Sequence, residues 1–275
     1  PVHFAGLPCD MQSIATIARA HGALVIEDAC HALGATYEDG SREGNCRYAD
    51  MAVFSFHPVK LIAAGEGGLI TTNDEALYKN LLLLRNHGMN RTPDEWTDKP
   101  QGFEAGKANP WYYEMQSLGY NYRMTDMQCA LALSQFRKLD RFAARRREIA
   151  QHYDDVLNAL PAITLPQRGR RDRSANHLYV TRIDFKRLGT TRGHVMRTLR
   201  GSGIGCQVHY IPVTLQPYYK ANGYADGSWP EAERYYEEAL TIPLYYGMTD
   251  DDVAAVIEAV SAIVSGSRSR GAASA

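Results

Sequence analysis

The order of its apolar segments constrains this chain more than any other feature of its sequence. Segments with the apolar period of a helix alternate with short apolar runs that are typical of strands. The strands are predicted at residues 23–26, 51–56 and 69–72, and the helices at residues 10–22 and 74–85. Such alternation is typical of a mostly parallel sheet flanked by helices, so the predicted fold class is α/β.

The remaining residues predict a loop, a long helix and a smaller unit. Residues 86–118 lack clear periodicity and contain three prolines, so we expect a long loop that covers a site. Residues 125–160 have helical spacing and predict one long helix. Beyond it, strands are predicted at 178–183 and 206–211, and helices at 192–200, 229–240 and 249–261.

These segments predict the domain organisation. Residues 1–124 would form part of a large domain, 125–160 a connecting helix, 161–264 a small α+β domain at the C-terminal end, and 265–275 a flexible tail. The chain opens at Pro1 with what reads as a strand end and a turn. We therefore expect the N-terminal part of the large domain to be missing.

Composition excludes several classes of function. With 30 Lys and Arg against 31 Asp and Glu, no overall field draws the chain to nucleic acid or to an anionic membrane. The apolar runs are far shorter than the about 20 residues of a membrane-spanning helix, so we expect a soluble protein. Five scattered cysteines fit a reducing, cytoplasmic compartment. Neither H-x-x-x-H nor paired-cysteine spacing occurs, so no metal site is predicted.

Polar side chains lie where the first two predicted strands end. Asp28 follows the first strand, and Ser55 and Lys60 lie at and after the end of the second. Alone, Asp28 would be a turn cap and Lys60 a surface charge. Together they lie at the edge of a parallel sheet where ligands bind. Lys60 closely follows an apolar strand, so we expect it to lie close to the core. A lysine in such a place loses its proton more readily than a free amine, whose pKa is about 10.4, and can form a Schiff base. Lysine, carboxylate and hydroxyl suit the aldehyde, ring nitrogen and phosphate of pyridoxal 5'-phosphate.

The same residues stand in motifs that resemble the DegT/DnrJ/EryC1/StrS family of nucleotide-sugar aminotransferases. The motifs are IEDACHALGA at 26–35, FSFHPVK at 54–60, GEGG at 65–68, LGYNYRMTD at 118–126, VHYIP at 208–212 and LTIPL at 240–244. The resemblance covers nearly the whole chain except its tail. It implies the pyridoxal-phosphate-dependent transferase fold, of the type of aspartate aminotransferase type I.

The resemblance also implies residue roles. Lys60 would bind the cofactor aldehyde and move a proton, and Asp28 would hold the pyridine nitrogen. Ser55 would contact the cofactor phosphate. His31 takes the place of a residue against the cofactor ring, although it could instead be a buried, satisfied histidine. Asn121 matches a position that reaches the phosphate of a neighbouring subunit, which implies a homodimer with shared active sites.

Within the family, the HPVK sequence at Lys60 and the segments 111–116 and 207–213 are most similar to the transaminases of pseudaminic acid synthesis. The implied reaction transfers an amino group, with L-glutamate as donor, to a UDP-linked 4-keto-6-deoxy-N-acetyl hexose. Substrate candidates are His57, His87 and Tyr210. His57 could equally shape the loop before Lys60, and His87 and Tyr210 could be surface or packing residues.

Three alternatives remain open. A 3-keto nucleotide-sugar aminotransferase of the same family would share Asp28, Ser55 and Lys60. A sugar dehydratase of a sister group would carry histidine in place of Lys60, so the lysine argues against it. A truncated, non-catalytic homologue could keep the fold and pair with an active partner. No turn of small residues before a helix supplies a clear phosphate cradle, so we expect activity to need a segment upstream of residue 1.

Overall fold

The computed structural model describes residues 1–224 and 228–266. Its first part is built on a three-stranded sheet of order β1-β2-β3, formed by β1 (Ile26–Asp28), β2 (Met51–Ser55) and β3 (Gly68–Thr71). β1 and β2 are parallel, and β3 runs antiparallel to β2. Behind the sheet, an apolar cluster that includes Ala32, Phe54 and Ile62 forms the core. The α/β class is therefore confirmed.

The first strand begins later than the sequence predicts. The prediction was residues 23–26, whereas β1 begins at Ile26, which pairs with Met51 at the start of β2. A strand needs a partner, so the ladder can begin only where β2 begins. The shift places Asp28 inside the strand, as its last residue.

Both predicted helices of this part are confirmed. α1 (Met11–Ala20) begins after Asp10, whose side chain accepts the N–H of Ser13. α2 (Glu75–Leu84) begins after Asp74, whose side chain accepts the N–H of Leu77. These side chains satisfy backbone donors that the first turn of a helix leaves free.

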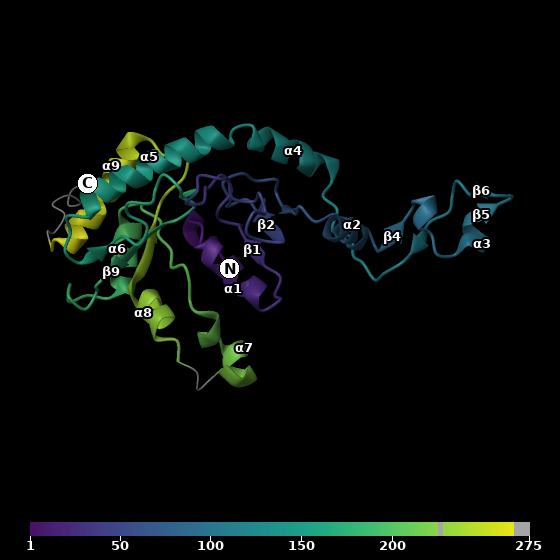
Figure 1. Cartoon of the computed structure of the whole chain (residues 1–275). Helices are drawn as coiled ribbons and strands as arrows, with labels where there is room; N and C mark the ends of the chain where they lie inside the picture. Colours follow the sequence, from purple (N-terminus) through teal and green to yellow (C-terminus); the bar gives the residue numbers. More distant parts are fainter. Residues whose placement is uncertain (225–227, 267–275) are drawn as a thin grey trace.

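Residues 86–118, which we call the arm, are more ordered than the predicted loop. Their short elements are β4 (Met89–Asn90), η2 (Pro93–Glu95), α3 (Lys99–Gly102), β5 (Phe103–Glu104), β6 (Lys107–Ala108) and β7 (Glu114–Met115). β4 pairs with β7 and β5 with β6, and the buried ring of Trp96 packs on Phe103 and Tyr112. The arm extends away from the body (Figure 1), so it does not lie over Asp28 and Lys60 of its own chain, and the prediction that it covers a site stays a prediction. Three of its aromatic side chains, those of Trp96, Phe103 and Tyr112, pack on one another.

The predicted single helix at residues 125–160 is two helices. α4 (Asp126–Phe136) begins with a capping box of Thr125 and Gln128, and α5 (Leu139–Leu157) follows after a break. Together they arch over the body (Figure 1). Leu139 is buried and its side chain lies over Gly34, so the break directs the first turn of α5 into the core.

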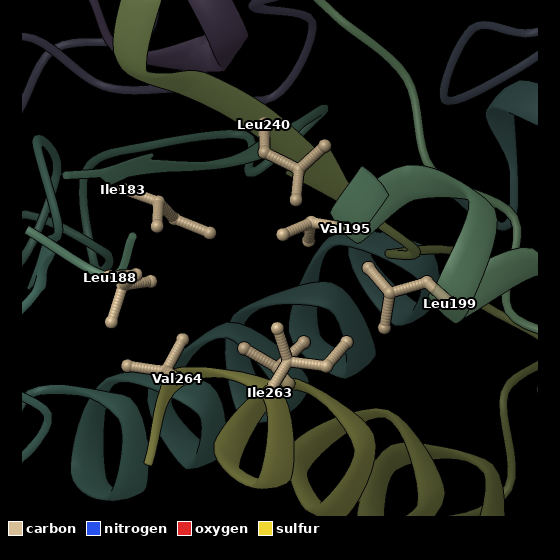
Figure 2. Close-up of a pocket in the computed structure, with 8 residues that line it drawn as sticks. Ile183, Leu188, Val195, Leu199, Leu240, Ile263 and Val264 are labelled. Atoms are coloured by element: carbon tan, nitrogen blue, oxygen red, sulfur yellow. The ribbon is translucent and has the colours of Figure 1, made fainter. Parts of the chain in front are cut away.

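A second sheet of order β10-β9-β8 forms the centre of the C-terminal part. Its antiparallel strands are β8 (Ile163–Thr164), β9 (Tyr179–Ile183) and β10 (Ala239–Ile242). Buried aliphatic side chains join this sheet to α5, α6 (Arg192–Gly201) and α9 (Asp250–Val264). Figure 2 shows some of them, including Leu199 and Leu240, pointing into one purely aliphatic space. This space is packing core and offers a ligand no polar group.

Two predictions for this part are wrong. Residues 206–211 form no strand; only Gln207 makes an isolated bridge, to Thr241 of β10. The predicted helix at 229–240 ends early, since α8 (Pro230–Glu238) is followed directly by β10. Leu240 and its neighbours fit a strand because β9 offers them a partner and all four residues of β10 are buried. The remaining short elements are η1 (Phe4–Gly6), η3 (Val213–Leu215), α7 (Pro217–Tyr219) and η4 (Lys220–Tyr224).

The predicted domain limits stay a prediction. Most of the predicted tail, from residue 267, lies outside the described residues. None of the helices described here combines the length and apolar character needed to cross a membrane.

Candidate active site

Asp28 stands at the end of β1, beside Lys60. Its carboxylate accepts the backbone N–H of Cys30 at 3.1 Å. Burial works to raise the pKa of Asp28, but hydrogen bonds from Cys30 and the positive charge of Lys60 outweigh burial and lower it. Asp28 is therefore an ionised carboxylate at neutral pH.

Lys60 is half-buried in the turn that follows β2. Its backbone N–H donates to the carbonyl of His57 at 2.9 Å, which closes the turn. Partial burial lowers the pKa of Lys60, against the opposing effect of Cys30 and Asp28. The amine thus loses its proton more readily than that of an exposed lysine, as the sequence predicts for a lysine that binds a carbonyl.

The glycine-rich loop shapes the end of β2 beside Lys60. Ser55, the last residue of β2, pairs with Gly68 of β3, and its Oγ accepts the N–H of His57 at 3.3 Å. A side chain at Gly68 would meet the carbonyl oxygen of Phe54 at 2.8 Å, so glycine is required there. His57 is exposed, with Nε2 3.9 Å from Oε1 of Glu66. These contacts favour a loop-shaping role for His57, and contact with substrate stays a prediction.

Three histidines, His31, His177 and His209, lie near Lys60. His31 is buried, its Nδ1 accepts the N–H of Ala5 at 3.3 Å, and its ring centre lies 4.4 Å from that of His177. Burial, together with Lys60, lowers the pKa of His31 to about 4. Burial lowers the pKa of His177 to about 2, and burial and Lys60 lower that of His209. All three rings are therefore neutral at pH 7, and an uncharged His31 suits packing against an aromatic ring.

His177 was not predicted from the sequence. It stands just before β9, more than a hundred residues from Lys60, and no motif distinguishes it from an ordinary buried histidine. His209 lies in the VHYIP motif, beside the predicted Tyr210. The Nδ1 atom of His209 lies 2.8 Å from the Thr241 hydroxyl, which orients its ring.

The other predicted site residues lie in different places. Tyr210 is half exposed, and its ring lies 6.0 Å from that of Phe4, on the side of the three histidines. His87 belongs to the arm, and Asn121 is exposed just beyond it, in a bridge with Asn86. Within residues 1–224 and 228–266, no hydrogen bond or ion pair joins His87 or Asn121 to Asp28 or Lys60. Their roles stay predictions.

The model of the DegT/DnrJ/EryC1/StrS aminotransferase family matches residues 1–261. This chain belongs to that family. The predicted family is confirmed, and with it the pyridoxal-phosphate-dependent transferase fold. Members of the family are aminotransferases that use pyridoxal phosphate, so the predicted class of enzyme and cofactor agree with membership.

Three proteins illustrate the similarity of this chain to members of the family. The chain is 41% identical over 271 residues to the spore coat polysaccharide biosynthesis protein SpsC of Bacillus subtilis, covering 97% of this chain and 66% of SpsC. It is similar to the structure of Helicobacter pylori PseC, an aminotransferase of pseudoaminic acid biosynthesis, with a TM-score of 0.84 and 28% identity, covering 96% of this chain and 66% of PseC. The chain is also similar to the pyridoxal-phosphate form of the putative sugar aminotransferase Spr1654 of Streptococcus pneumoniae. The TM-score is 0.81 and the identity 27%, and the match covers 98% of this chain and 68% of Spr1654. The chain thus spans about two thirds of their lengths.

The residues around Lys60 fit this cofactor. An ionised Asp28 matches a protonated ring nitrogen, the half-buried Lys60 amine matches an aldehyde, and neutral His31 matches the ring face. For the phosphate, Ser55 stays the predicted contact within one subunit. The helices α1, α2 and α4 have N-termini closed by their own side chains, Asp10, Asp74 and Thr125. None of these three helices therefore offers an open cradle of backbone amides.

Proposed function

We propose that this protein transfers an amino group from L-glutamate to the 4-keto group of a UDP-linked 4-keto-6-deoxy-N-acetyl hexose, in pseudaminic acid biosynthesis. The observation that carries the transamination is the pairing of Lys60, with its lowered pKa, and the ionised Asp28. The likeness to PseC supports the sugar. The relation to SpsC supports a role in the biosynthesis of a polysaccharide.

The predicted site residues have distinct physical functions in the proposed reaction. Bound pyridoxal phosphate supplies an aldehyde that bonds amines and a ring that withdraws electrons. The Asp28 carboxylate accepts a hydrogen bond from the ring nitrogen and keeps it protonated. Lys60 Nζ would hold the aldehyde carbon and, when freed by the donor amine, would accept the proton from the donor's Cα. His31 packs on the ring, and the Ser55 hydroxyl donates to the phosphate.

We propose a cytoplasmic homodimer with shared sites, in which Asn121 of one subunit serves the phosphate of the other. Helices α2 and α4 bury none of their residues in the described chain. They and their neighbours expose large apolar side chains, namely Leu84, Tyr120, Met127, Leu131, Leu133 and Phe136. Apolar surface of this kind favours an interface with further protein. Analytical sedimentation should detect the dimer. Asn121→Ala should weaken cofactor binding but leave the dimer intact.

The decisive test is chemical. Pyridoxal phosphate and borohydride should label Lys60, as peptide mapping can show, and glutamate should convert the absorbance band of the bound aldehyde to that of the amine form. Lys60→Ala should abolish both, whereas Lys79→Ala, which removes an exposed lysine, should change neither. A chain unlabelled at Lys60 would support the non-catalytic homologue.

Substrate choice needs a separate assay. Purified protein should aminate the 4-keto nucleotide sugar with glutamate as donor. Preferential amination of a 3-keto sugar would identify the alternative 3-keto aminotransferase and leave the roles of Lys60 and Asp28 in place.

A further inference from the structure

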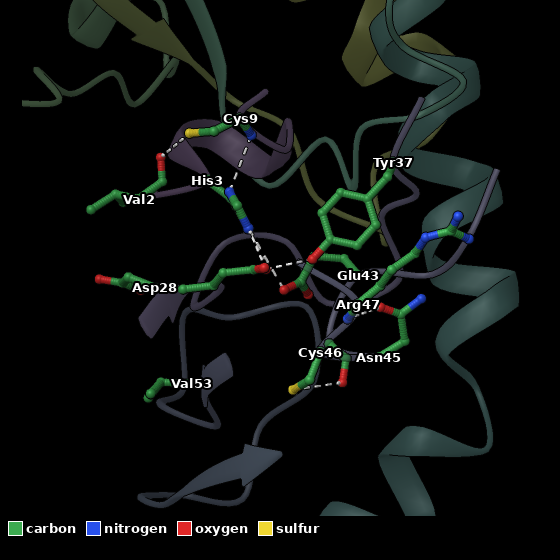
Figure 3. Close-up of polar contacts among 12 residues, drawn as sticks. Val2, His3, Cys9, Asp28, Tyr37, Glu43, Asn45, Cys46, Arg47 and Val53 are labelled. Atoms are coloured by element: carbon green, nitrogen blue, oxygen red, sulfur yellow. Dashed lines mark hydrogen bonds and ion pairs between the residues drawn. The ribbon is translucent and has the colours of Figure 1, made fainter. Parts of the chain in front are cut away.

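A buried cluster of titratable groups lies on the face of β1 opposite to Asp28. Nε2 of His3 lies 2.9 Å from Oε2 of Glu27, and the hydroxyl of Tyr37 donates to the same oxygen at 2.5 Å. Glu43 completes the cluster, with Oε1 3.7 Å from Nε2 of His3. Figure 3 shows His3, Tyr37 and Glu43 pointing toward one another while Asp28 points away. Side chains alternate along a strand, so Glu27 and Asp28 face opposite sides.

The polar groups of this cluster are not all satisfied. The side chains of His3, Glu27 and Glu43 are inaccessible to solvent. Oε1 of Glu27 and both carboxyl oxygens of Glu43 have no donor among the described residues. Two buried, charged carboxylates side by side, with three of their four oxygens lacking a donor, would be very costly. The cluster must therefore hold a cation or an additional proton.

A metal ion fits the spacing but not the hydrogen bonds of His3. One ligand atom from each of His3, Glu27 and Glu43 lies within 4.8 Å of the others. A metal-binding histidine, however, offers one nitrogen to the metal and donates from the other. The N–H of Cys9 donates to Nδ1 of His3 at 3.2 Å, so Nδ1 is an acceptor and the ring proton lies on Nε2, which donates to Glu27. Neither nitrogen is left for a metal.

The hydrogen bond from the N–H of Cys9 to Nδ1 also decides the charge of His3. Burial opposes a second proton on the ring, whereas contacts with Cys9 and the two glutamates work to raise the pKa of His3. The N–H of Cys9 occupies the place that a second ring proton would need. We therefore assign His3 a single proton, on Nε2, and the cluster needs its extra proton on a carboxyl group.

We propose that Glu27 and Glu43 share one proton, carried by Glu43, and that this carboxyl pair positions Asp28. A protonated Glu43 donates to Oε1 of Glu27, which gives Glu27 three donors in all. Of the three unpartnered oxygens, only one, on Glu43, then remains. The pair ties the loop that carries Glu43 to β1.

The electrostatics of the cluster agree with this assignment. Burial, and to a lesser extent Glu27, raises the pKa of Glu43 to about 8. Burial also opposes the charge on Glu27, but donors from His3 and Tyr37 outweigh it and lower the pKa of Glu27. The titratable groups that face Glu43 are His3 from the N-terminal segment, Glu27 from β1, and Tyr37 and Cys46 from its own loop.

His3 links the cluster to Asp28. Its ring donates to Glu27, while its backbone N–H donates to the carbonyl of Asp28 at 3.0 Å. The N–H of Asp28 in turn donates to the carbonyl of Pro1 at 2.9 Å. Ionisation of Glu43 would place a second negative charge in a dry site, which must open to water and release this edge of β1. Asp28 would then lose its fixed position, a consequence that matters for catalysis through the proposed role of Asp28.

The sign of the pH effect follows from the pKa values. The unfolded state loses the Glu43 proton near pH 4.5 and the folded state near pH 8. Between them the folded state binds one proton more, so stability falls as pH rises through this range. Glu43→Gln keeps a donor to Glu27 but has no proton to lose. With each unit of pH in this range, the unfolding constant of the wild type should therefore rise by up to about tenfold more than that of Glu43→Gln. Glu38→Gln, which changes an exposed side chain of the same loop, should follow the wild type.

The test uses the purified chain without added cofactor. Urea unfolding from pH 5 to pH 9 gives the constants, and amide hydrogen exchange of peptides covering residues 1–3 and β1 reports the position of Asp28. Exchange there, corrected for its intrinsic pH dependence, should accelerate above pH 8 in the wild type and in Glu38→Gln but not in Glu43→Gln. Parallel slopes and parallel exchange in wild type and Glu43→Gln would overturn the proposal.

Two measurements on the wild type guard against a variant that does not fold. Carbon-13 NMR of labelled glutamate carboxyls should show one group titrating near pH 8, and its absence would refute the shared proton. Elemental analysis that found one equivalent of bound metal after dialysis, lost in Glu43→Gln, would also refute it. Because no cofactor is present, a failed transamination assay would count against the proposed function and leave these results standing.

Discussion

A buried ion pair in the C-terminal part offers the sharpest test of stability. Arg171 contacts both carboxylate oxygens of Asp154, with Nε and Nη2 each at 3.0 Å, and Tyr179 donates to the same carboxylate at 2.7 Å. The side chains of Arg171 and Asp154 are only 3% and 1% exposed. Asp154→Asn keeps the shape but removes the charge, so the guanidinium of Arg171 is left buried and uncompensated.

Breaking such a pair costs about 3–5 kcal/mol. Since Asn keeps one oxygen acceptor, we expect about 3 kcal/mol, which is roughly a hundredfold in the unfolding constant. Urea unfolding followed by circular dichroism measures it. Asp155→Asn changes the exposed neighbour and should stay within about 0.5 kcal/mol of the wild type.

The triple variant Asp154→Leu with Arg171→Met and Tyr179→Phe separates loss of a charge partner from loss of packing, because it also removes the buried hydroxyl that donates to Asp154. Removing both charges should recover most of the stability, because well-packed apolar residues often replace a buried ion pair without loss. A cost below about 1 kcal/mol for Asp154→Asn alone would refute the reasoning, because the guanidinium would then have found water or another partner.

Three further predictions follow from other parts of the structure. Leu199→Ala empties part of the aliphatic core of Figure 2 and should cost about 2–5 kcal/mol in urea unfolding, while Met127→Ala, at an 82% exposed position, should cost far less in a monomeric sample. Thr249→Ala removes half of the capping box of α9 and should lower stability by about 1 kcal/mol, seen as a lower Tm. Asp28→Asn should lower kcat of transamination at least about a hundredfold with unchanged unfolding, and full activity would exclude the proposed role of its charge.

Much of the candidate site could be predicted from the sequence because its parts lie in short motifs. The sequence places Asp28 at the end of one strand and Lys60 just after the next. The two residues lie close together if these strands are parallel neighbours, and β1 and β2 do pair in parallel. The neutral state of His31 could not be predicted, since it depends on burial beside Lys60 and His177. No motif in the sequence distinguishes Glu43, because its burial depends on contacts with His3 and Glu27 from other segments.

The amino-acid sequence alone determined the helix starts at Asp10, Asp74 and Thr249, and the apolar run of β2. Caps and periodicity act between residues a few positions apart, so a short window contains all the information. The tertiary structure decided where β1 begins, that Leu240 joins a strand, and that residues 206–211 do not. These outcomes depend on partners far along the chain, because a strand is stabilised by its neighbour and a buried charge by whatever group the fold places against it.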